Sequence, residues 1–402
     1  MSYKVFITGM GMVSAIGFDV PQALHALRHC QTGIGPIRFL QTRHRGTLPA
    51  AEVKASDYEL ATLLGLDDIR DYSRTALLGI MAAREAAAHA RLHEHPYLRT
   101  GIVSATSVGG IDKSEVFFGE FLKDQARGGD LHYMVSHDCG DSTERIADDL
   151  GIKDFVSTIS TACSSAANAI MLGARLIKAG MLDRVLVGGS DAITRYTLNG
   201  FNSLRIVDEN WCRPFDQNRN GLNLGEAAAY LVLESARAVE ESRKTPLAEL
   251  SGFGNANDAY HQTASSPDGA GALRAMQLAL HQSGLTTSHI DYINAHGTAT
   301  PNNDLSEGQA LKNLFKDYLP RFSSTKSYTG HTLAAAGSVE AVISVLSLQH
   351  GIIIPNLNFK DPIAELEIAP VVAFEEGIAL RSILSNSFGF GGNCSAMIFS
   401  SC

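Results

Sequence analysis

Long apolar runs and a secretion signal are both missing from this 402-residue sequence. No window of about 18 apolar residues stands out, so we expect no transmembrane helix and no membrane partner. The first residues, MSYKVFITGMGMVSAIG, contain one lysine and a short apolar strand. They lack the long apolar core and the cleavage site of a signal peptide.

Paired cysteines are missing as well. The six cysteines make no CxxC pair and no zinc-ligand spacing; they are Cys30, Cys139, Cys163, Cys212, Cys394 and Cys402. Such sparse cysteines in a long chain indicate reduced thiols. We therefore predict a cytoplasmic protein without a bound metal.

Blocks of like charge and low-complexity segments are also absent. The net charge of -9 is spread along the chain, which argues against a nucleic-acid partner. The glycine cluster GMGMVS follows a strand, but Ser14 stands where a dinucleotide-binding fingerprint needs its third glycine. We expect Gly9 and Gly11 to serve close packing instead.

The sequence does contain a regular alternation of strands and helices. Apolar strands such as YKVFITGMG and DRVLVGGSDA alternate with helical stretches such as TALLGIMAAREAAAHARL, which predicts a helix-covered, largely parallel sheet. The alternation restarts near residue 250 and ends with strands in APVVAFEE and SILSNSFGFGGNCSAMIFS. We predict two similar α/β halves, 1–250 and 251–402.

The segment STACSSAANAIMLGARLIKAGM places Cys163 between a β-type run and a helix of small residues. We expect the helix to begin at this cysteine. The helix dipole and the free N–H groups at such a helix start stabilise a thiolate. The small residues suit a buried helix with close neighbours. Taken alone, the segment fits either a reactive thiol or a buried structural cysteine.

Two histidines occur near the ends of predicted strands. His296 ends an apolar strand in NAHGTATPNND, where it is either a catalytic group or a core histidine. His331 lies in SSTKSYTGHTLAAAGSVEA, after Lys326 and before Glu340. A lysine beside an apolar strand end needs a partner, so we expect Lys326 and Glu340 to hold His331 in one orientation.

Phenylalanines alternate with glycines in SNSFGFGGNCSAMIF. Phe388 and Phe390 lie on a glycine-hinged segment that can gate a pocket, and its N–H groups can bind an oxyanion. The simplest combined interpretation is a cysteine nucleophile with two histidine helpers. A cysteine protease would leave Lys326 and His331 unexplained.

Together these segments resemble the β-ketoacyl-acyl carrier protein synthases, the decarboxylating ketosynthases of fatty acid and polyketide synthesis, in their type II-like, Cys-His-His form. The similarity covers essentially the whole chain. It rests on VFITGMGMVSAIG, STACSSAANAI, RPFDQNRNGLNLGEAAAYLVLE, NAHGTATPNND, STKSYTGHTLAAAGSVEA and NSFGFGG. The resemblance implies a thiolase-like five-layer αβαβα fold of two pseudo-symmetric halves, the first carrying Cys163 and the second carrying His296, Lys326 and His331.

The resemblance also implies a role for each reactive group. Cys163 takes the acyl chain as a thioester, and the N–H groups of Cys163 and Phe390 form the oxyanion hole. His296 and His331 bind the malonyl thioester and promote its decarboxylation. The expected reaction is an acyl transfer that joins the two units into a β-ketoacyl product and releases CO2.

Supporting roles follow from the same resemblance. Lys326 orients His331, with Glu340 as its structural partner. The implied substrate contacts are Thr298 and Thr300 for the phosphopantetheine arm, and Val108, Phe201, Phe388 and Phe390 for the acyl side. No cofactor is implied, because the phosphopantetheine of an acyl carrier protein carries both substrates.

An acyl carrier protein is the implied partner, together with either a second copy of the chain or a chain-length-factor-like homologue. Asn393-Cys394 stands where the family commonly has Thr-Asn, beside the predicted gate. This departure favours a specialised enzyme that makes a polyketide, an aryl polyene or an unusual acyl chain.

Two alternatives stay open. One is a non-decarboxylating thiolase that acts on coenzyme A thioesters, with Cys394 as its second catalytic cysteine. The other is a non-catalytic, chain-length-factor-like subunit.

Overall fold

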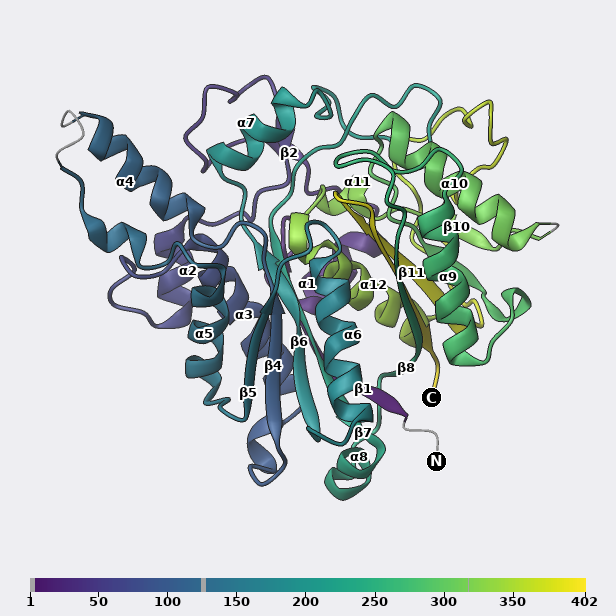
Figure 1. Ribbon diagram of the computed structural model, residues 1–402, viewed down its shortest axis with the longest axis horizontal. Helices are drawn as coiled ribbons and strands as arrows, with labels where there is room; N and C mark the ends of the chain where they lie inside the picture. Colours follow the sequence, from purple (N-terminus) through teal and green to yellow (C-terminus); the bar gives the residue numbers. More distant parts are fainter. Residues whose placement is uncertain (1–3, 124–127, 317) are drawn as a thin grey trace.

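A mixed sheet runs through the molecule in the computed structural model, which describes residues 4–123, 128–316 and 318–402 (Figure 1). The strands follow the order β10-β9-β11-β12-β8-β1-β7-β6-β4-β5. Their bounds are β1 Val5–Ser14, β4 Thr100–Ala105, β5 Phe155–Ile159, β6 Arg184–Asp191, β7 Ala227–Ser235, β8 Ala248–Asn257, β9 Tyr292–Asn294, β10 Arg321–Ser323, β11 Ser382–Gly389 and β12 Asn393–Ser400. A separate small pair joins β2 (Gly35–Pro36) to β3 (Pro49–Ala50).

The same strand order occurs twice. From the outer edge inward, the first set of strands is β5-β4-β6-β7-β1 and the second set is β10-β9-β11-β12-β8. When the strands of each set are numbered along the chain, both sets have the order third, second, fourth, fifth, first. In each set the three outer strands are parallel to one another, and the two remaining pairings toward the centre are antiparallel. The second set begins with β8 at Ala248, so the predicted boundary after residue 250 falls inside a strand. The division into halves at that residue stays a prediction.

Helices form the other three layers. Figure 1 shows α6 and α12 between the two sets of strands, α3 and α5 outside the first set, and α9 and α10 outside the second. The helix bounds are α1 Val20–Arg28, α2 Asp57–Leu64, α3 Arg74–His89, α4 Ile111–Lys123, α5 Cys139–Leu150, α6 Ser165–Lys178, α7 Arg195–Ser203, α8 Ala236–Ser242, α9 Ala270–Ser283, α10 Pro301–Phe315, α11 Lys326–Thr329 and α12 Ala336–His350. The predicted five-layer αβαβα fold is confirmed.

The strands are apolar because both of their faces are covered. In β7, Leu231 and Leu233 pack into the central core with α6 and α12, whereas Tyr230 and Val232 pack into the outer core with α3. A strand that is buried on both faces has a continuous run of apolar residues in its sequence, instead of alternating apolar and polar residues. This is why the strand segments could be recognised in the sequence but their faces could not.

Glycines let the central helices approach each other and the sheet. A Cβ on Gly337 of α12 would lie 2.8 Å from the backbone nitrogen of Ala167 in α6, and one on Gly173 would lie 2.3 Å from Cγ1 of Val187 in β6. Real Cβ atoms essentially never come closer than 3.0 Å to such neighbours. The small residues of the Cys163 segment therefore serve a tightly packed central layer.

One long segment is strongly apolar, although Glu340 and several serines interrupt it. Leu333–His350 spans 18 residues with a mean hydropathy of 1.3, enough to cross a membrane by length and composition alone. However, 89% of this segment is buried inside the protein. Its hydropathy is that of a core helix, because α12 lies between the two sets of strands.

Two predicted strands also need correction. Residues 369–376, APVVAFEE, form no strand; Glu375 alone bridges to Ile353. The last predicted strand is a hairpin of β11 and β12, which pair antiparallel up to Gly389 opposite Asn393. The glycines that suggested a mobile loop form the turn of this hairpin.

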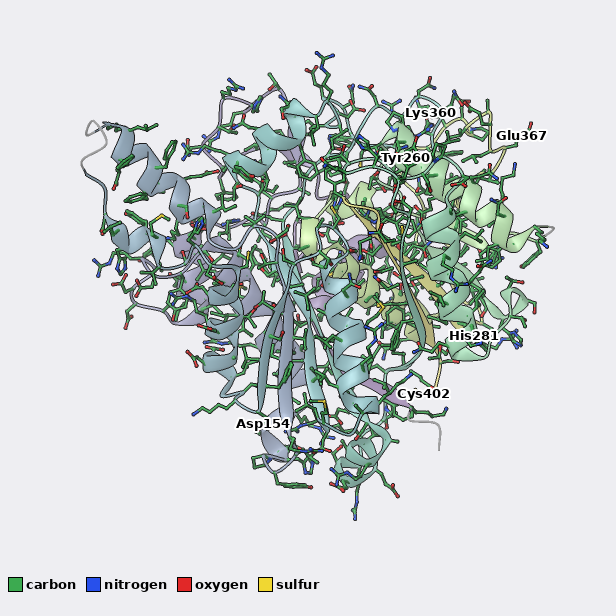
Figure 2. All side chains as sticks on the ribbon, in the orientation of Figure 1. Asp154, Tyr260, His281, Lys360, Glu367 and Cys402 are labelled. Carbon is green, nitrogen blue, oxygen red and sulfur yellow. The ribbon has the colours of Figure 1, made fainter. Side chains whose placement is uncertain are left out.

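The carboxyl ends of β5 and β8 point to the same end of the molecule. Figure 2 shows Asp154, which directly precedes β5, at one end, and Tyr260, which follows β8, at the opposite end. The segments that follow β5 and β8 therefore lie at this second end, whereas β7 and β12, which run antiparallel to β1 and β8, end at the other. Ligand sites in α/β proteins form at such carboxyl ends.

We expect Gly337→Ala to lower the free energy of unfolding by about 1–3 kcal/mol, because the new methyl group forces α6 and α12 apart. Gly119→Ala in α4 is the matched control: a Cβ there meets nothing within 4 Å. It should be neutral or stabilising by about 0.5–1 kcal/mol. Melting temperatures of the two variants provide the measurement, and equal values would contradict close helix contact.

Candidate active site

Cys163 lies in a tight turn between β5 and α6. Ala162 adopts a φ of +52°, in a region that residues with a side chain seldom occupy. The helix begins at Ser165, so the expectation that it starts on the cysteine itself was wrong by two residues. Ser387 of β11 donates a hydrogen bond to the Cys163 carbonyl at 3.2 Å, which ties the turn to the second half of the protein.

Burial dominates the chemistry of this thiol. It raises the pKa of Cys163 to about 12, although the Lys326 charge and the backbone N–H groups of Phe390 and Cys163 oppose the increase. In the free protein desolvation therefore outweighs the helix end and favours the neutral thiol over the thiolate. The two N–H groups predicted for the oxyanion hole do lie beside the sulfur.

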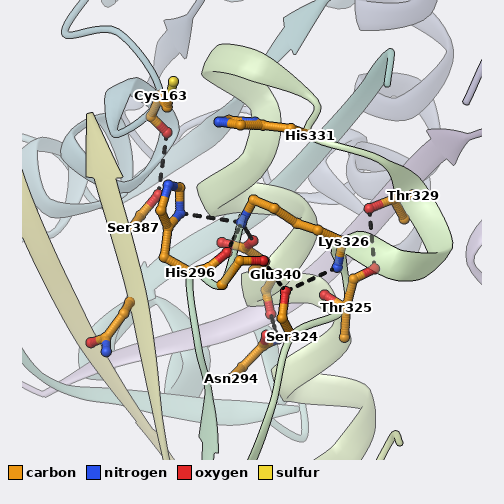
Figure 3. Close-up of polar contacts among 12 residues, drawn as sticks. Cys163, Asn294, His296, Ser324, Thr325, Lys326, Thr329, His331, Glu340 and Ser387 are labelled. Atoms are coloured by element: carbon orange, nitrogen blue, oxygen red, sulfur yellow. Dashed lines mark hydrogen bonds and ion pairs between the residues drawn. The ribbon is translucent and has the colours of Figure 1, made fainter. Parts of the chain in front are cut away.

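His296 and His331 lie side by side on the second half. His296 follows β9, and His331 follows the short helix α11. Their ring centroids are 5.5 Å apart with an interplanar angle of 89°, and each side chain is 2% exposed. Both rings come close to Cys163 (Figure 3).

Both histidines are neutral, and their hydrogen bonds fix the tautomer. The Leu333 N–H donates to Nδ1 of His331 at 3.2 Å, and Nζ of Lys326 lies 3.2 Å from Nδ1 of His296. Because Nδ1 accepts in both rings, the remaining proton is on Nε2. Burial, followed by the Lys326 charge, holds both pKa values well below the usual range.

Lys326 contacts His296 and not His331, which corrects the sequence-based expectation. Its ammonium group bonds to Nδ1 and to the carbonyl of His296 and forms a buried ion pair with Glu340 (Figure 3). Burial raises the pKa of Glu340 to about 7, and Lys326 opposes that shift. Lys326 reaches His331 only through its charge.

Two buried acidic residues near His296 were missed from the sequence. Glu307 accepts the backbone N–H groups of His296 and Gly297 at 2.9 and 2.8 Å. Asp304 accepts those of Phe215 and Ala299. The signal was their spacing of three on α10, directly after the histidine motif, which puts both carboxylates on one helix face.

Several buried oxygens below the histidines have no hydrogen-bond partner: Asn294 Oδ1, Glu340 Oε2, Ser385 Oγ and Asn386 Oδ1. Asn294 and Ser385 are neighbours in the pairing of β9 with β11, and Asn294 also donates to the Glu340 carbonyl. Oxygen ligands suit a hard cation, so this group could hold one. Among the described residues, no three His, Cys, Asp or Glu side chains form a metal cluster.

A cavity of about 300 Å³ connects the reactive groups. The predicted residues that line it are Cys163, Phe201, His296, Thr298, Thr300, His331, Phe388 and Phe390. Lys326 and Glu340 lie behind this wall. Val108 also lies behind it, packed in an apolar cluster with Leu222 and Phe201.

A pair of phenylalanines closes one side of the cavity. The rings of Phe201 and Phe390 stack with centroids 5.8 Å apart and an interplanar angle of 17°. Gly391 and Gly392, with φ values of +82° and +78°, follow Phe390 in the hairpin turn.

The unusual Asn393-Cys394 pair has two separate environments. Oδ1 of Asn393 accepts hydrogen bonds from Ser164 at 2.7 Å and from Asn168 at 2.9 Å, which joins the hairpin to the start of α6. Cys394 is buried and lines the cavity, and burial raises its pKa to about 12. A second thiol is therefore present near Cys163.

Family models match most of the chain. Those for the beta-ketoacyl synthase N-terminal and C-terminal domains match residues 2–238 and 247–360. "3-oxoacyl-[acyl-carrier-protein] synthase 2" of Staphylococcus aureus (strain COL) is 33% identical over 408 residues, 98% of each protein. "Nodulation protein E" of Rhizobium meliloti (strain 1021) is 33% identical over 409 residues, 99% of each.

Solved structures match equally broadly. "The ishigamide ketosynthase/chain length factor" has a TM-score of 0.94 at 30% identity, covering 100% of this chain and 99% of that chain. The ketosynthase ApeO, solved with its chain length factor ApeC from Xenorhabdus doucetiae, has a TM-score of 0.86 at 30% identity, covering 100% and 98%. Matches of this extent confirm the resemblance drawn from the motifs: the chain belongs to the beta-ketoacyl synthase family.

Proposed function

We propose that this protein catalyses a decarboxylative condensation. It joins an acyl group, held as a thioester on Cys163, to malonyl-acyl carrier protein, and the products are β-ketoacyl-acyl carrier protein and CO2. The observation that carries the proposal is a buried thiol sharing one cavity with two neutral imidazoles, whose Nε2–H groups are free to donate. The names of the relatives support the same reaction.

Acyl transfer is the first step. The Cys163 sulfur attacks the carbonyl carbon of an acyl thioester, and the N–H groups of Cys163 and Phe390 bind the oxyanion that forms. Because the thiol is neutral in the free protein, its proton moves to the departing phosphopantetheine sulfur during the exchange. The carrier protein leaves with a free thiol.

Decarboxylation and condensation follow. A malonyl thioester enters the cavity, and its carbonyl oxygen accepts hydrogen bonds from Nε2–H of His296 and His331. These bonds strengthen as CO2 leaves and negative charge collects on the enolate oxygen. The enolate carbon then attacks the acyl carbonyl on Cys163, and the cysteine sulfur leaves and takes up a proton.

Substrate contacts are assigned by position in the cavity. The hydroxyl groups of Thr298 and Thr300, 2.8 Å apart, bind the phosphopantetheine arm. Phe388 lies against His296 on the malonyl side, with ring centroids 5.5 Å apart. Phe390 gates the acyl side, where Phe201 and Val108 form the pocket. No bound cofactor or metal takes part in these steps.

The protein's partners are an acyl carrier protein and a second ketosynthase-like chain. The edge strand β5 exposes Val156, and α4 with the segment after it exposes more apolar side chains: Val116, Phe118, Leu122, Leu131 and Val135. An open sheet edge and exposed apolar side chains both favour a subunit interface. The second subunit is another copy or a chain-length-factor-like homologue, as in the ApeO–ApeC complex.

The cellular setting follows from the partners and the composition. We assign the enzyme to the cytoplasm and to fatty acid synthesis or type II polyketide or polyene synthesis, aryl polyenes included. A non-catalytic, chain-length-factor-like role is disfavoured, because Cys163 and both histidines share the cavity.

Thiolase chemistry is the second candidate, because Cys394 gives the cavity a second thiol. A thiolase would cleave acetoacetyl-coenzyme A without any malonyl donor. The Cys394→Ala variant separates the two functions: the proposed condensation needs only Cys163.

Cys163→Ala should abolish condensation while retaining decarboxylation of malonyl-acyl carrier protein, because the histidines that stabilise the enolate are untouched. Product analysis by mass spectrometry and CO2 release measure the two activities. Cys394→Ala is the matched control and should condense at the wild-type rate. Elongation by Cys163→Ala, or its loss in Cys394→Ala, would contradict the assignment.

Phe390→Ala should change the choice of acyl chain more than it changes stability. The ring is half-buried and stacks on Phe201, so its loss opens the acyl side with little damage to the core. The ratio of Cys163 acylation by long and by short acyl carrier proteins should shift by about tenfold. An unchanged ratio with normal activity would show that the ring is no gate.

Phe118→Asp should convert a dimer into a monomer, because it places a charge in the apolar α4 patch. The side chain is 57% exposed, so the fold of one subunit is not affected. Tyr97→Asp, at a side chain that is 66% exposed outside this patch, is the control. Light scattering after gel filtration gives the mass; dimers of both variants would exclude α4 from the interface.

A further inference from the structure

Asp191 is a buried carboxylate that the proposed mechanism does not use. It is the last residue of β6 and is fully buried. Among the residues that the structure describes, every hydrogen bond to its carboxylate comes from an uncharged donor. A buried carboxylate held only by such donors is costly, so its contacts have a specific purpose.

One oxygen of Asp191 holds the turn after β4. Oδ1 accepts the hydroxyl of Thr106 and the backbone N–H groups of Ser107 and Val108, the last two at 3.1 and 3.0 Å. Val108 packs in the apolar cluster that lies behind the Phe201–Phe390 pair. This oxygen therefore fixes the wall of the proposed acyl pocket.

The other oxygen of Asp191 holds the turn after His331. Oδ2 accepts the backbone N–H of Ala334 at 2.8 Å and the hydroxyl of Ser107 at 2.6 Å. Ala334 follows Leu333, whose N–H donates to Nδ1 of His331. Leu333 has a φ of +52°, so this strained turn depends on its contacts to keep its shape.

We propose that Asp191 is a positioning residue for His331. Its bond to Ala334 holds the neighbouring Leu333 N–H in place against Nδ1 of His331, and its bond to Val108 fixes the acyl-pocket wall relative to that ring. The inference rests on the proposed function, since it assigns the decarboxylating step to His331. Asp191 itself touches no substrate.

Asp191→Asn separates the two contacts. An amide keeps one acceptor oxygen, and the three donors at the Oδ1 side direct that oxygen toward the Thr106–Val108 turn. The amide NH2 then faces the Ala334 N–H, and this hydrogen bond is lost. The variant thus keeps the pocket wall and frees the His331 turn.

The expected result is a split between the two partial reactions. Acylation of Cys163, followed by mass spectrometry, should stay within about twofold of the wild-type rate, because Asp191 makes no hydrogen bond to the thiol or to the oxyanion hole among the described residues. The kcat for malonyl decarboxylation should fall on the order of 10- to 100-fold with KM unchanged, since a small misplacement of a catalytic group has such an effect. A purely structural role would slow both reactions together.

Two controls complete the experiment. Ser107→Ala removes a donor but leaves the Ala334 bond, so it should decarboxylate at nearly the wild-type rate. Asp183→Asn changes a buried aspartate at the other end of the same strand and should leave both partial rates unchanged. If Asp191→Asn does not fold, Asp191→Ser replaces it. Serine loses the contacts of both oxygens, so its decarboxylation rate is compared with that of Thr106→Val, which loses one Oδ1 contact and keeps the Ala334 bond; equal rates would overturn the role of Asp191.

The outcomes distinguish this inference from the proposed function. A wild-type protein that neither acylates Cys163 nor decarboxylates malonyl-acyl carrier protein would overturn the proposed function. A wild-type protein that performs both, with an Asp191→Asn variant that decarboxylates equally fast or loses both activities together, would overturn the role of Asp191 alone.

Discussion

The contact between α6 and α12 is the constraint on which the site depends. These two helices touch where Gly337 meets Ala167, and no side chain larger than these fits between the backbones. The start of α6 carries Cys163, and the turn before α12 carries His331. A wider separation of the helices would take the thiol and the imidazole out of their common cavity. The small residues of both helices are therefore a condition of the chemistry as well as of packing.

Burial also decides the charge of every reactive group. It favours the protonated thiol and keeps both imidazoles neutral, while Lys326 is paired with Glu340 and also bonds to His296 from behind the cavity wall. The two imidazoles and the backbone N–H groups of Cys163 and Phe390 thus present donors without a net charge of their own. Negative charge develops only on the substrate, where fixed N–H groups already point. Little reorganisation is then needed during the reaction.

The identities of the site residues could be predicted from the sequence, because short motifs fix them, but most of their contacts could not. Lys326 precedes His331 by five residues, yet it bonds to His296, since the ends of β9 and α11 meet only in three dimensions. The helix start at Ser165 depends on the unusual backbone of Ala162. APVVAFEE is apolar like a strand but finds no partner strand, which no local pattern reveals. The α/β alternation predicted a helix-covered sheet, and the five-layer order followed only from the family resemblance. The contacts of Asp191, Asp304 and Glu307 with backbone N–H groups of distant loops could not be predicted from local patterns.

The repeated strand order has a consequence for how this chemistry arose. Each half places a buried helix after its third strand, so α6 and α12 occupy equivalent positions. A duplicated and fused ancestral unit would leave such a pattern, with two identical helix starts facing each other. If the segments before α6 and α12 were identical, they could supply two thiols or two imidazoles to the cavity, but not one of each. Because the two halves differ at these points, with Cys163 before α6 and His331 before α12, a single molecule brings a thiol and an imidazole to the same cavity.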